Sequence, residues 1–515
     1  MYALETKVNE RSFANQSYVI HNMISCKKIN LYKLTTMRNL KQVLLALIMM
    51  CCSISSAIAG GYEYEDLYRG LPFDMPRIEK PVFPDATVSV VKYGAVGDGQ
   101  HKCTAAIQRA IDEMAAKGGG KVIIPSGLWL TGPIVLKDNI NLHLEKGATL
   151  LFSPDINDYP IVNTTYEGIP AKRAQSPISA TGVKNIAITG RGVIDGNGEV
   201  WRPLKQEKTT PAQWKRITSQ GGFYRRATMW APAKEDLPRP IMVNLYECKN
   251  VLLEGVVFQN SPAWNVHPEC CENVIIDGVD IRNPSYAQNG DGLDLDACKN
   301  CIVVNTTFDV GDDGICIKSG KDEHGRKRGR ACENVIISGC TVYAGHGGFV
   351  IGSEMSGGVK NIKCSDCQFL GTDIGLRFKS CRGRGGVVEN IWIEDISMVN
   401  ILGDAIRFNL YYGAKTVMVD NPDGTKRPAE IAAEPVTEKT PSFRNLHIKN
   451  IMCSGAQRAI YFNGLPEMPV KDVTMENVVI TANEAGYMTY CKNIKQKNVT
   501  VKAKDNKPVG EYYCK

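Results

Sequence analysis

Acidic residues, a histidine and basic residues recur in four glycine-rich segments between Asn289 and Lys379. The segments read NGDGLDLDA from Asn289, GDDGICIKSG from Gly311, GHGGFVIGSEMSGG from Gly345 and GLRFKS from Gly375. Clustered carboxylates push one another's pKa values apart, so that one can donate a proton while another accepts one. The segments therefore predict acid–base chemistry, provided that the fold brings them together.

The spacing of these segments matches a structural repeat. Asp291 and Asp312 are 21 residues apart, Asp312 and His346 are 34 apart with a loop between them, and His346 and Arg377 are 31 apart. If each interval is one coil of a solenoid, the four segments lie on successive rungs of one sheet. Three steps at the strand spacing of about 4.8 Å span roughly 15 Å, the length of two or three sugar rings.

A repeated unit runs through the chain from Lys184 onward. Short runs of alternating apolar and polar residues begin with Lys-Asn or Glu-Asn, as in KNVLLEGVVFQN, ENVIIDGVDIRN and KNCIVVNTTF. The asparagines stand at positions 185, 250, 273, 300, 334, 361, 390, 445 and 493. Because no unit shows a helical stretch, we expect an all-β fold, a right-handed parallel β-helix. Asparagine at each turn can adopt the left-handed conformation and hydrogen-bond to its neighbour in the next coil.

One helix and two long loops are expected beside the coils. Residues 104–116 carry apolar side chains at helical spacing, and only strands follow, which predicts a helix that caps the open N-terminal end. Residues 60–86 are rich in proline, tyrosine and charge and are expected to form an N-terminal arm before a single catalytic domain over residues 87–515. Loops near 201–240 and 411–441 suit the walls of a sugar-binding groove, or padding of the surface.

The first 59 residues have the pattern of a leader. A basic segment that starts at Met37, an apolar run and Ala-Ile-Ala ending at Ala59 predict a secretory signal peptide cleaved before Gly60. An uncleaved anchor or a lipid on Cys51 is the alternative. We expect a periplasmic or secreted protein that has no membrane contact after cleavage, with Met1 or Met37 as its start.

The charge balance gives no argument for a nucleic-acid partner. The whole chain has 61 Lys and Arg against 54 Asp and Glu, a net charge of +7. Without residues 1–59 the balance is 54 against 52, a net charge of +2. The basic excess therefore belongs mostly to the leader.

Fifteen of the 18 cysteines follow the leader. The pairs Cys298/Cys301 and Cys364/Cys367 have the spacing of zinc ligands. Each pair straddles a repeat boundary, however, and cysteine is also a common small residue of buried cores. We expect buried packing or disulfides rather than a metal site.

Strand alternation assigns a face to the basic pair. With Leu376 and Phe378 pointing inward, Arg377 and Lys379 share the outer face. Two neighbouring cations repel each other unless an anion lies between them. Taken alone, the pair is more typical of a solvated face than of a binding site.

The two acidic segments are less clear. Alternation favours Asp294 and Asp296 as the outward pair, and Asp291 joins them only if the glycines beside it form a turn. In the next segment a bulge or turn at Gly311 is expected to present both acids of the Asp-Asp pair, because a buried unpaired carboxylate is costly. Periodicity alone leaves the choice in the first segment open.

Calcium is the main rival explanation for the acidic cluster. Many basic residues lie near it in sequence and suit direct recognition of carboxylates without a metal, so no cofactor is expected. These residues are Lys318, Lys321, Arg326, Lys327, Arg328, Arg330, Arg377 and Lys379.

Residues 86–500 resemble glycoside hydrolase family 28, the polygalacturonases and related pectin hydrolases. The resemblance covers VVKYGAVGDG…TAAIQRAID, RPIMVNLYECKNV…NSPAWNVHP and four motifs in order. The family's Asn-Thr-Asp is present as Asn-Gly-Asp at 289–291, where the middle residue differs. Gly-Asp-Asp is at 311–313, Gly-His-Gly at 345–347, and Arg-Ile-Lys is present as Arg-Phe-Lys at 377–379. The resemblance implies a pectin lyase-like β-helix.

The resemblance also implies roles for the motif residues. The implied catalytic residues are Asp291, Asp312, Asp313 and His346, and the implied substrate-binding residues are Asn289, Lys318, Arg377 and Lys379. Asp312 would be the general acid of an inverting hydrolysis, while Asp291 and Asp313 would hold and activate the water. His346 would support the acid, and Arg377 and Lys379 would bind a galacturonate carboxylate.

The segments KSGKDEHGRKRGR and GHGGFVIGSEMSGG look like the exo-acting bacterial branch of that family. We therefore expect an exported, monomeric hydrolase that cleaves α-1,4-galacturonosyl linkages of pectin from the non-reducing end. A hydrolase of a substituted pectin such as rhamnogalacturonan is one alternative. A non-catalytic carbohydrate-binding β-helix and a calcium-dependent pectate lyase are two others.

Overall fold

The computed structural model describes residues 62–414, 416–421 and 426–515. The chain divides into two compact units, one up to Arg69 and one from Gly70 onward, and the described part of the first contains the short helix α3 (Glu65–Tyr68). The predicted signal peptide lies outside the described residues. Among the described residues, no helix is long and apolar enough to span a membrane.

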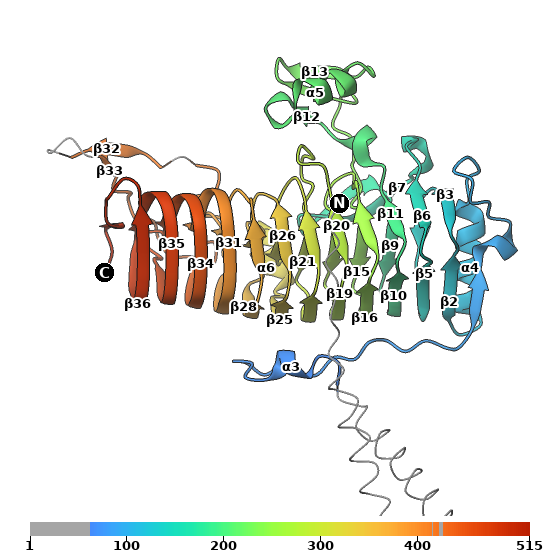
Figure 1. Cartoon of the computed structure of the whole chain (residues 1–515), viewed down its shortest axis with the longest axis horizontal. Coiled ribbons are helices and arrows are strands. Elements are labelled where there is room, and N and C mark those ends of the chain that lie inside the picture. Colours follow the sequence, from blue (N-terminus) through green and yellow to red (C-terminus); the bar gives the residue numbers. More distant parts are fainter. Residues whose placement is uncertain (1–61, 415, 422–425) are drawn as a thin grey trace, which may run out of the picture. The chain divides into compact units, whose positions relative to one another are not determined.

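The second unit is a parallel β-helix, in which 30 strands form one continuous sheet (Figure 1). Each coil contributes strands to three columns. The first column contains β1 (Thr87–Ser89), β2 (Gly120–Ile124), β5 (Ile140–Leu144), β10 (Lys184–Gly190), β16 (Lys249–Glu254), β19 (Glu272–Asp277), β22 (Lys299–Val304), β25 (Cys332–Ser338) and β28 (Val359–Ser365). The second contains β3 (Gly127–Thr131), β6 (Ala148–Phe152), β11 (Val193–Asp195), β17 (Val257–Gln259), β20 (Asp280–Arg282), β23 (Thr307–Asp309), β26 (Thr341–Ala344) and β29 (Gln368–Leu370).

The third column carries the candidate site. It contains β4 (Ile134–Val135), β9 (Ile178–Thr181), β15 (Val243–Tyr246), β18 (Val266–Glu269), β21 (Leu293–Asp296), β24 (Ile315–Lys318), β27 (Phe349–Ile351) and β30 (Leu376–Lys379). The long strands β31 (Val387–Asn409), β34 (Ser442–Asn463) and β35 (Val470–Thr489) continue through all three columns, and β36 (Cys491–Ala503) and β37 (Gly510–Tyr512) follow them.

Several elements lie outside the coils. Residues 198–240 form a small fold of their own, with η3 (Gly198–Trp201), β12 (Leu204–Lys205), η4 (Gln206–Lys208), α5 (Pro211–Thr218), β13 (Phe223–Arg226) and β14 (Met229–Ala231). The remaining elements are η1 (Val90–Tyr93), α4 (Thr104–Ala116), η2 (Ile156–Asp158), β7 (Ile161–Tyr166), β8 (Ile169–Ala174), α6 (Asp322–Arg328), β32 (Met418–Asp420) and β33 (Lys426–Pro428). The helix α6 between β24 and β25 corrects the expectation that no repeat contains a helical stretch.

The alternation of side chains builds the core of the coil. Inward residues of successive rungs are fully buried, as with Leu295, Ile317 and Ile351 in neighbouring third-column strands. The rings of Phe378 and Phe408 stack with centroids 4.2 Å apart. Because identical positions stack rung on rung, the outward residues of the same strands are also held in register.

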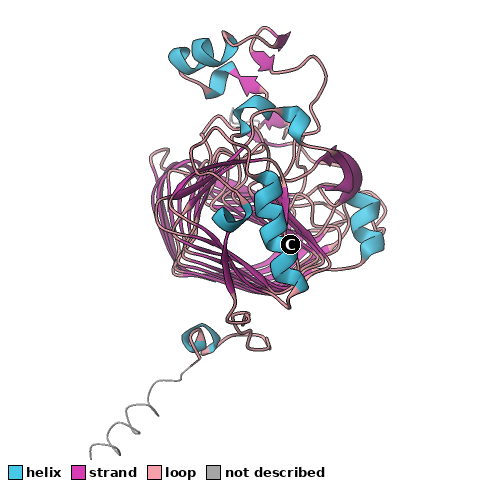
Figure 2. Cartoon of the chain, turned by 90° about the vertical axis from the view of Figure 1, so that its right-hand side faces the viewer, coloured by secondary structure: helices cyan, strands magenta, loops and turns pink. Residues whose placement is uncertain are grey.

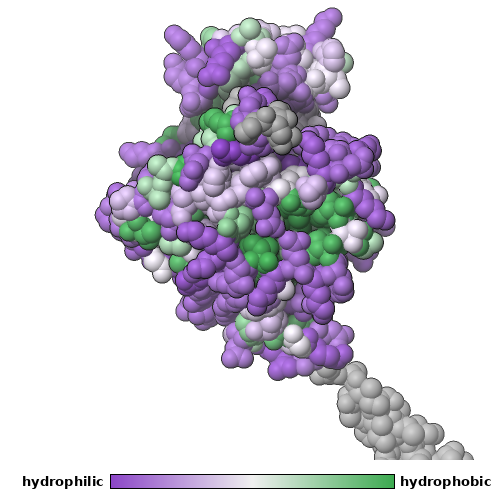
Figure 3. Space-filling view, turned by 90° about the vertical axis from the view of Figure 1, so that its left-hand side faces the viewer, coloured by the Kyte–Doolittle hydropathy of each residue, from purple (hydrophilic) through white to green (hydrophobic). Residues whose placement is uncertain are grey.

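The helix α4 caps the first coil, as predicted. It lies across the end of the β-helix in Figure 2, and its apolar stripe, which includes Ile107, Ile111 and Met114, is buried against the coil. The other end carries apolar residues among polar ones in Figure 3, and Ile494 and Val501 of β36 are only partly buried there. From Gly70 onward the arm runs beside the coils, where Lys80 pairs with Glu254 at 2.6 Å.

The predicted asparagine ladder is present. Asn300 donates from its side-chain amide to Asn273 at 3.2 Å and accepts from Asn334 at 3.1 Å. Its φ is 56°, in the left-handed region, and the other ladder asparagines share that conformation. The ladder therefore fixes the turn between coils through both backbone conformation and side-chain hydrogen bonds.

The cysteines pack in the core. All fifteen cysteines of the described residues are free thiols, and thirteen of them are buried. The sulfurs of Cys364 and Cys367 are 4.0 Å apart, which is a contact and not a disulfide bond. The packing interpretation is therefore confirmed for the described part of the chain.

Asn300→Ala should lower the free energy of unfolding by about 2–4 kcal/mol, because two side-chain hydrogen bonds are lost and alanine is strained in the left-handed region. Asn300→Gly removes the same hydrogen bonds without that strain and should cost about 1–2 kcal/mol. Urea unfolding of both variants checks the difference. Equal losses would contradict a role for the backbone conformation.

Candidate active site

The four sequence segments lie on successive rungs of the third column. Asp294 of β21 is in register with Cys316 of β24, Cys316 with Val350 of β27, and Val350 with Arg377 of β30. The predicted stacking is confirmed. The catalytic candidates Asp291, Asp312, Asp313 and His346 all lie in the turns that precede these strands.

Three carboxylates meet in those turns. One oxygen each of Asp291, Asp312 and Asp313 lies within 4.8 Å of the other two. Asp291 reaches the cluster because its glycine flanks form a tight turn, where a Cβ on Gly292 would lie 2.6 Å from the carbonyl oxygen of Gly314. This answers the question that alternation left open.

The basic pair of β30 binds one of these acids. Arg377 donates to Asp313 Oδ1 at 2.7 Å, and Lys379 donates to Asp313 Oδ2 at 2.5 Å. Burial acts to raise the pKa of the Asp313 carboxyl, but the charges of Lys379, Arg377 and Lys318 outweigh burial and hold that pKa well below its usual range. Asp313 is therefore a carboxylate, and the pair is not a solvated face.

Asp312 contacts the histidine. Its Oδ1 lies 3.0 Å from His346 Nδ1, and its side chain is 16% exposed. Burial acts to raise the pKa of Asp312, but the hydrogen bond from His346 and the charge of Lys379 outweigh it, so that the pKa lies below its usual value. In the free protein Asp312 is therefore a partly buried, ionised acid.

Lys208 orients the histidine from the other side. Its Nζ lies 2.9 Å from His346 Nε2 and 3.4 Å from the carbonyl oxygen of Gly311. An ammonium group only donates hydrogen bonds, so Nε2 accepts and Nδ1 carries the proton that points at Asp312. Lys208 belongs to the first insertion, residues 198–240, which thus reaches the centre of the site.

Lys318 lies beneath the acids. Its Nζ is 3.0 Å from Glu354, 3.4 Å from Asp294 and 4.0 Å from Asp291, and it lies 4.5 Å from the ring centroid of Trp264. Burial raises the pKa of Asp291 well above its usual range, and the charges of Asp312 and Asp294 add to that effect. Burial likewise raises the pKa of Asp294 to about 7, although Lys318 opposes it.

The outward acids of β21 are covered by other side chains. Asp296 is fully buried 3.6 Å from His267 and 3.5 Å from Arg328, which also binds Glu269 at 2.6 Å. Asp294 is fully buried beside Lys318. Alternation correctly placed Asp294 and Asp296 on the outer face. The acid that meets Asp312 and Asp313, however, is Asp291.

The basic loop after β24 does not present free cations, which corrects its interpretation as a carboxylate-binding segment. Lys321 pairs with Glu167 at 2.5 Å, and Lys327 pairs with Glu323 at 2.6 Å. The side chain of Arg326 donates to the backbone oxygen of Gly383 at 2.6 Å, and that of Arg330 donates to the backbone oxygen of Ala297 at 2.8 Å. The Lys327 pair lies within α6, whereas the contacts of Lys321, Arg326 and Arg330 join the loop to other parts of the domain.

Other residues that sequence reasoning missed line the same site. Arg239 donates to Asn289 Oδ1 at 2.8 Å and so holds the turn that carries Asp291. Tyr166 of the β7–β8 hairpin stacks on Trp264 with ring centroids 5.2 Å apart. Arg239 lies at the end of the first insertion, where no repeat marks it.

The outer face of the third column is hollowed toward the C-terminal coils. A hollow of about 350 Å³ is lined by His346, Asp373, Arg377 and Arg407 among others. A second, of about 470 Å³, shares Arg407 and adds Arg458, Tyr461 and Tyr487. Cations and tyrosines therefore continue from the acidic cluster in this direction.

The acidic cluster is poorly suited to calcium. Calcium takes about 6–8 oxygen ligands. Both oxygens of Asp313 already accept hydrogen bonds from Arg377 and Lys379, and Lys318 is within 4.0 Å of Asp291. Fixed side-chain cations supply the positive charge here.

Comparisons with known proteins agree with this geometry. Residues 138–502 match the model of the glycosyl hydrolases family 28. An exo-poly-alpha-D-galacturonosidase of Dickeya chrysanthemi is 29% identical over 73% of this chain, which spans 64% of that enzyme. An endo-polygalacturonase of Pectobacterium carotovorum subsp. carotovorum is 28% identical over 78% of the chain and 87% of that enzyme.

Solved structures give the same result. The hyperthermoactive exopolygalacturonase of Thermotoga maritima superposes with a TM-score of 0.69 at 32% sequence identity, covering 85% of this chain and 95% of that one. The pectin lyase-like β-helix expected from the resemblance is thereby confirmed. The chain belongs to glycosyl hydrolase family 28, and it is a glycoside hydrolase of the polygalacturonase type.

Proposed function

We propose that this enzyme hydrolyses α-1,4-galacturonosyl linkages of pectin and releases galacturonic acid from chain ends. The observation that carries the proposal is the carboxylate cluster bordered by Arg377 and Lys379, with oxygens of Asp291, Asp312 and Asp313 within 4.8 Å of one another. The similarity to the Dickeya and Thermotoga exo-acting enzymes supports it.

The three acids divide the work of a single displacement. Asp312, the most exposed of them, would protonate the glycosidic oxygen as the bond to the anomeric carbon breaks. A water would attack that carbon from the opposite face and give its proton to Asp291 or Asp313. Oxygens up to 4.8 Å apart can share one water at hydrogen-bond distances of about 2.8 Å.

This gap is smaller than the separation of about 6.5–9.5 Å usual for inverting glycosidases. Inversion therefore rests on a water held within the cluster, and it has its own test. Proton NMR of the first turnover should show β-galacturonic acid from the α-linked substrate, followed by mutarotation. If the α-anomer is the first product, the configuration is retained and the reaction is a double displacement instead.

Arg377 and Lys379 have donors left for the substrate. A guanidinium has five N–H groups and an ammonium has three, and Asp313 uses one bond from each. A galacturonate carboxylate bound between them would compensate the remaining positive charge. A neutral sugar at this position would leave that charge unpaired, which disfavours the rhamnogalacturonan alternative.

The two ends of the groove support the exo action. On the side of the N-terminal coils, the β7–β8 hairpin approaches the site, with Tyr166 on Trp264 and Glu167 paired with Lys321. On the other side the two hollows continue past Arg407. A chain could thus enter from one direction only and lose its terminal unit. We also propose that the enzyme acts outside the cytoplasm as a monomer.

Residues 60–515 incubated with polygalacturonate and a chelator test the proposal. Monomeric galacturonic acid should accumulate from the first time point, and the chelator should have no effect. A ladder of oligomers would still show hydrolysis but would contradict exo action. Loss of activity with chelator and an unsaturated product would indicate a calcium-dependent lyase. Binding without cleavage would indicate a carbohydrate-binding β-helix.

A further inference from the structure

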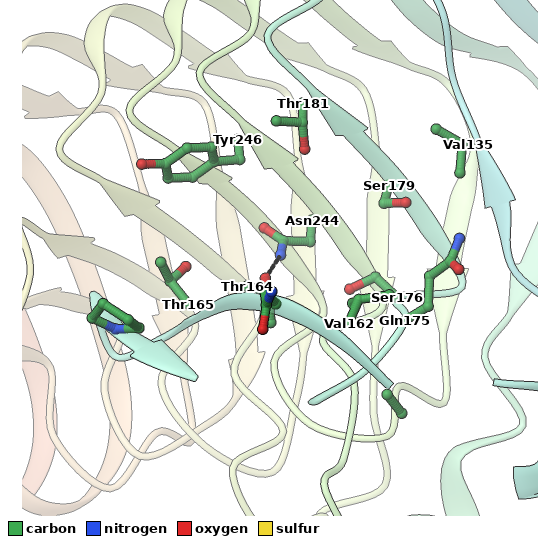
Figure 4. A pocket seen from close by; sticks show the side chains of 13 residues that line it. Val135, Val162, Thr164, Thr165, Gln175, Ser176, Ser179, Thr181, Asn244 and Tyr246 are labelled. Carbon is green, nitrogen blue, oxygen red and sulfur yellow. Dashed lines mark hydrogen bonds between the residues drawn. The ribbon is translucent and has the colours of Figure 1, made fainter. Parts of the chain in front are cut away.

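A separate cavity lies on the same sheet face, toward the N-terminal coils. Its floor includes Ser179 of β9 and Asn244 of β15, and the β7–β8 hairpin forms its roof (Figure 4). Its volume is about 600 Å³. Asn244 is in register with His267, so the cavity begins one rung before the buried residues beneath the catalytic cluster. The stacked Tyr166 and Trp264 lie between the two.

The chemistry of this cavity differs from that of the catalytic groove. Its described lining contains no aspartate, glutamate, lysine or arginine. Hydroxyl and amide groups supply both donors and acceptors, among them Thr164, Thr181, Gln175 and Ser176, and Tyr246 adds an aromatic ring. A carboxylate would find no cation here, and burying it unpaired would be costly.

One polar atom in the cavity lacks a partner. Asn244 is 8% exposed, and its Nδ2 donates to Thr164 Oγ1 at 3.2 Å. Its Oδ1 is buried and accepts no hydrogen bond from the described residues. In Figure 4 the amide nitrogen points to Thr164 while the oxygen points away from it. A ligand hydroxyl that reached this oxygen would supply the missing hydrogen bond.

We propose that this cavity is a second carbohydrate-binding site, which takes an uncharged sugar unit. The hydroxyl groups of a sugar donate and accept hydrogen bonds, as the amides and hydroxyls of the lining do. The ring of Tyr246 can pack against the C–H face of a sugar. The volume falls in the range of about 300–1,000 Å³ that is typical of small-molecule pockets. The cation-lined groove binds acidic sugars, whereas this cavity selects against them.

The proposal is tested with methyl α-L-rhamnopyranoside and methyl β-D-xylopyranoside as probes. Saturation-transfer NMR with the full-length protein should detect binding of at least one of these glycosides, and galacturonic acid should not compete. Asn244→Leu removes the unpaired oxygen at similar volume and should weaken binding at least tenfold. Hydrolysis of polygalacturonate by this variant should stay within twofold of the parent protein.

Two further variants keep the test decisive. Ser179→Val fills the cavity floor from a different strand and should also weaken binding of the neutral glycosides. Arg407→Ala, in the hollows beside the catalytic cluster, should weaken polygalacturonate hydrolysis and leave the neutral glycosides bound. Three results would overturn the proposal: no saturation transfer, binding unchanged in both cavity variants, or displacement by galacturonic acid.

Discussion

Asp312→Asn should reduce kcat on polygalacturonate by about 10²–10⁴-fold, the contribution usual for general acid catalysis, and should leave KM within a few-fold. The asparagine keeps the size of the side chain and a hydrogen bond with His346, so that the fold and the substrate contacts persist. It has no proton of suitable acidity for the leaving oxygen. Initial rates over a range of substrate concentrations separate the two parameters.

The electrostatics of the free enzyme make this prediction discriminating. Burial raises the pKa of Asp291 well above its usual range, whereas the pKa of Asp312 lies below its usual value because of His346 and nearby charges. Protons on coupled carboxylates belong to the cluster rather than to one residue. A proton bound by the cluster in the free enzyme therefore favours Asp291 over Asp312. The negative charge of a bound galacturonate would raise the pKa of Asp312 and favour transfer of the proton to it.

A substrate with a good leaving group separates the two acids. An aryl galacturonide that needs no protonation should be cleaved by Asp312→Asn at near the parent rate. Asp291→Asn should be slow on both the aryl substrate and the polymer, because attack by water is impaired in each case. The opposite pattern would assign the general acid to Asp291 and leave Asp312 as the base.

The periodic features were the ones that could be predicted from sequence. An asparagine at each turn and an apolar residue at each inward position repeat coil after coil, so position in the repeat determines position in space. This is why the stacking of the four segments, and the helical cap formed by residues 104–116, could be predicted. Alternation also placed Arg377 and Lys379 correctly on the outer face.

What the repeat does not encode could not be predicted. Lys208 and Arg239 belong to an insertion without periodicity, yet they contact His346 and Asn289. The Asp291 turn depends on close backbone packing at Gly292, which alternation does not describe. The partners of the basic loop are also distant in sequence, since Arg328 pairs with Glu269 across 59 residues. Long-range side-chain pairing decided each of these cases.

Lys318→Met should lower the free energy of unfolding by about 3–5 kcal/mol, the usual cost of removing one partner from a buried ion pair. Methionine keeps much of the packing against Trp264 but leaves Glu354, Asp294 and Asp291 without the cation that lies 3.0–4.0 Å from them. Urea unfolding measures the loss. Lys327→Met removes an exposed lysine that pairs with Glu323 and should leave the midpoint unchanged.

The pH dependence of stability shows whether Lys318 acts through its charge, and it starts from the pKa values of the parent protein. The folded pKa of Asp294 is raised from 3.8 to about 7, so between those values the folded protein binds more protons at Asp294 than the unfolded chain does. This group therefore makes stability fall as pH rises through that window. Asp313 has the opposite effect at lower pH, because its pKa is held well below the usual range and the stability it contributes is lost on acidification.

Without Lys318, the pKa values of Asp294 and Asp291 should rise further, because the nearest cation no longer favours their ionised forms. The loss of stability should therefore be larger at pH 7.5 than at pH 5. Activity should fall with it, since a protonated Asp291 cannot accept the proton of the attacking water. Adding Asp294→Asn should recover part of the stability, because one of the uncompensated carboxylates is then absent. A loss that is equal at both pH values, and unchanged in the double variant, would mean that Lys318 contributes packing rather than charge.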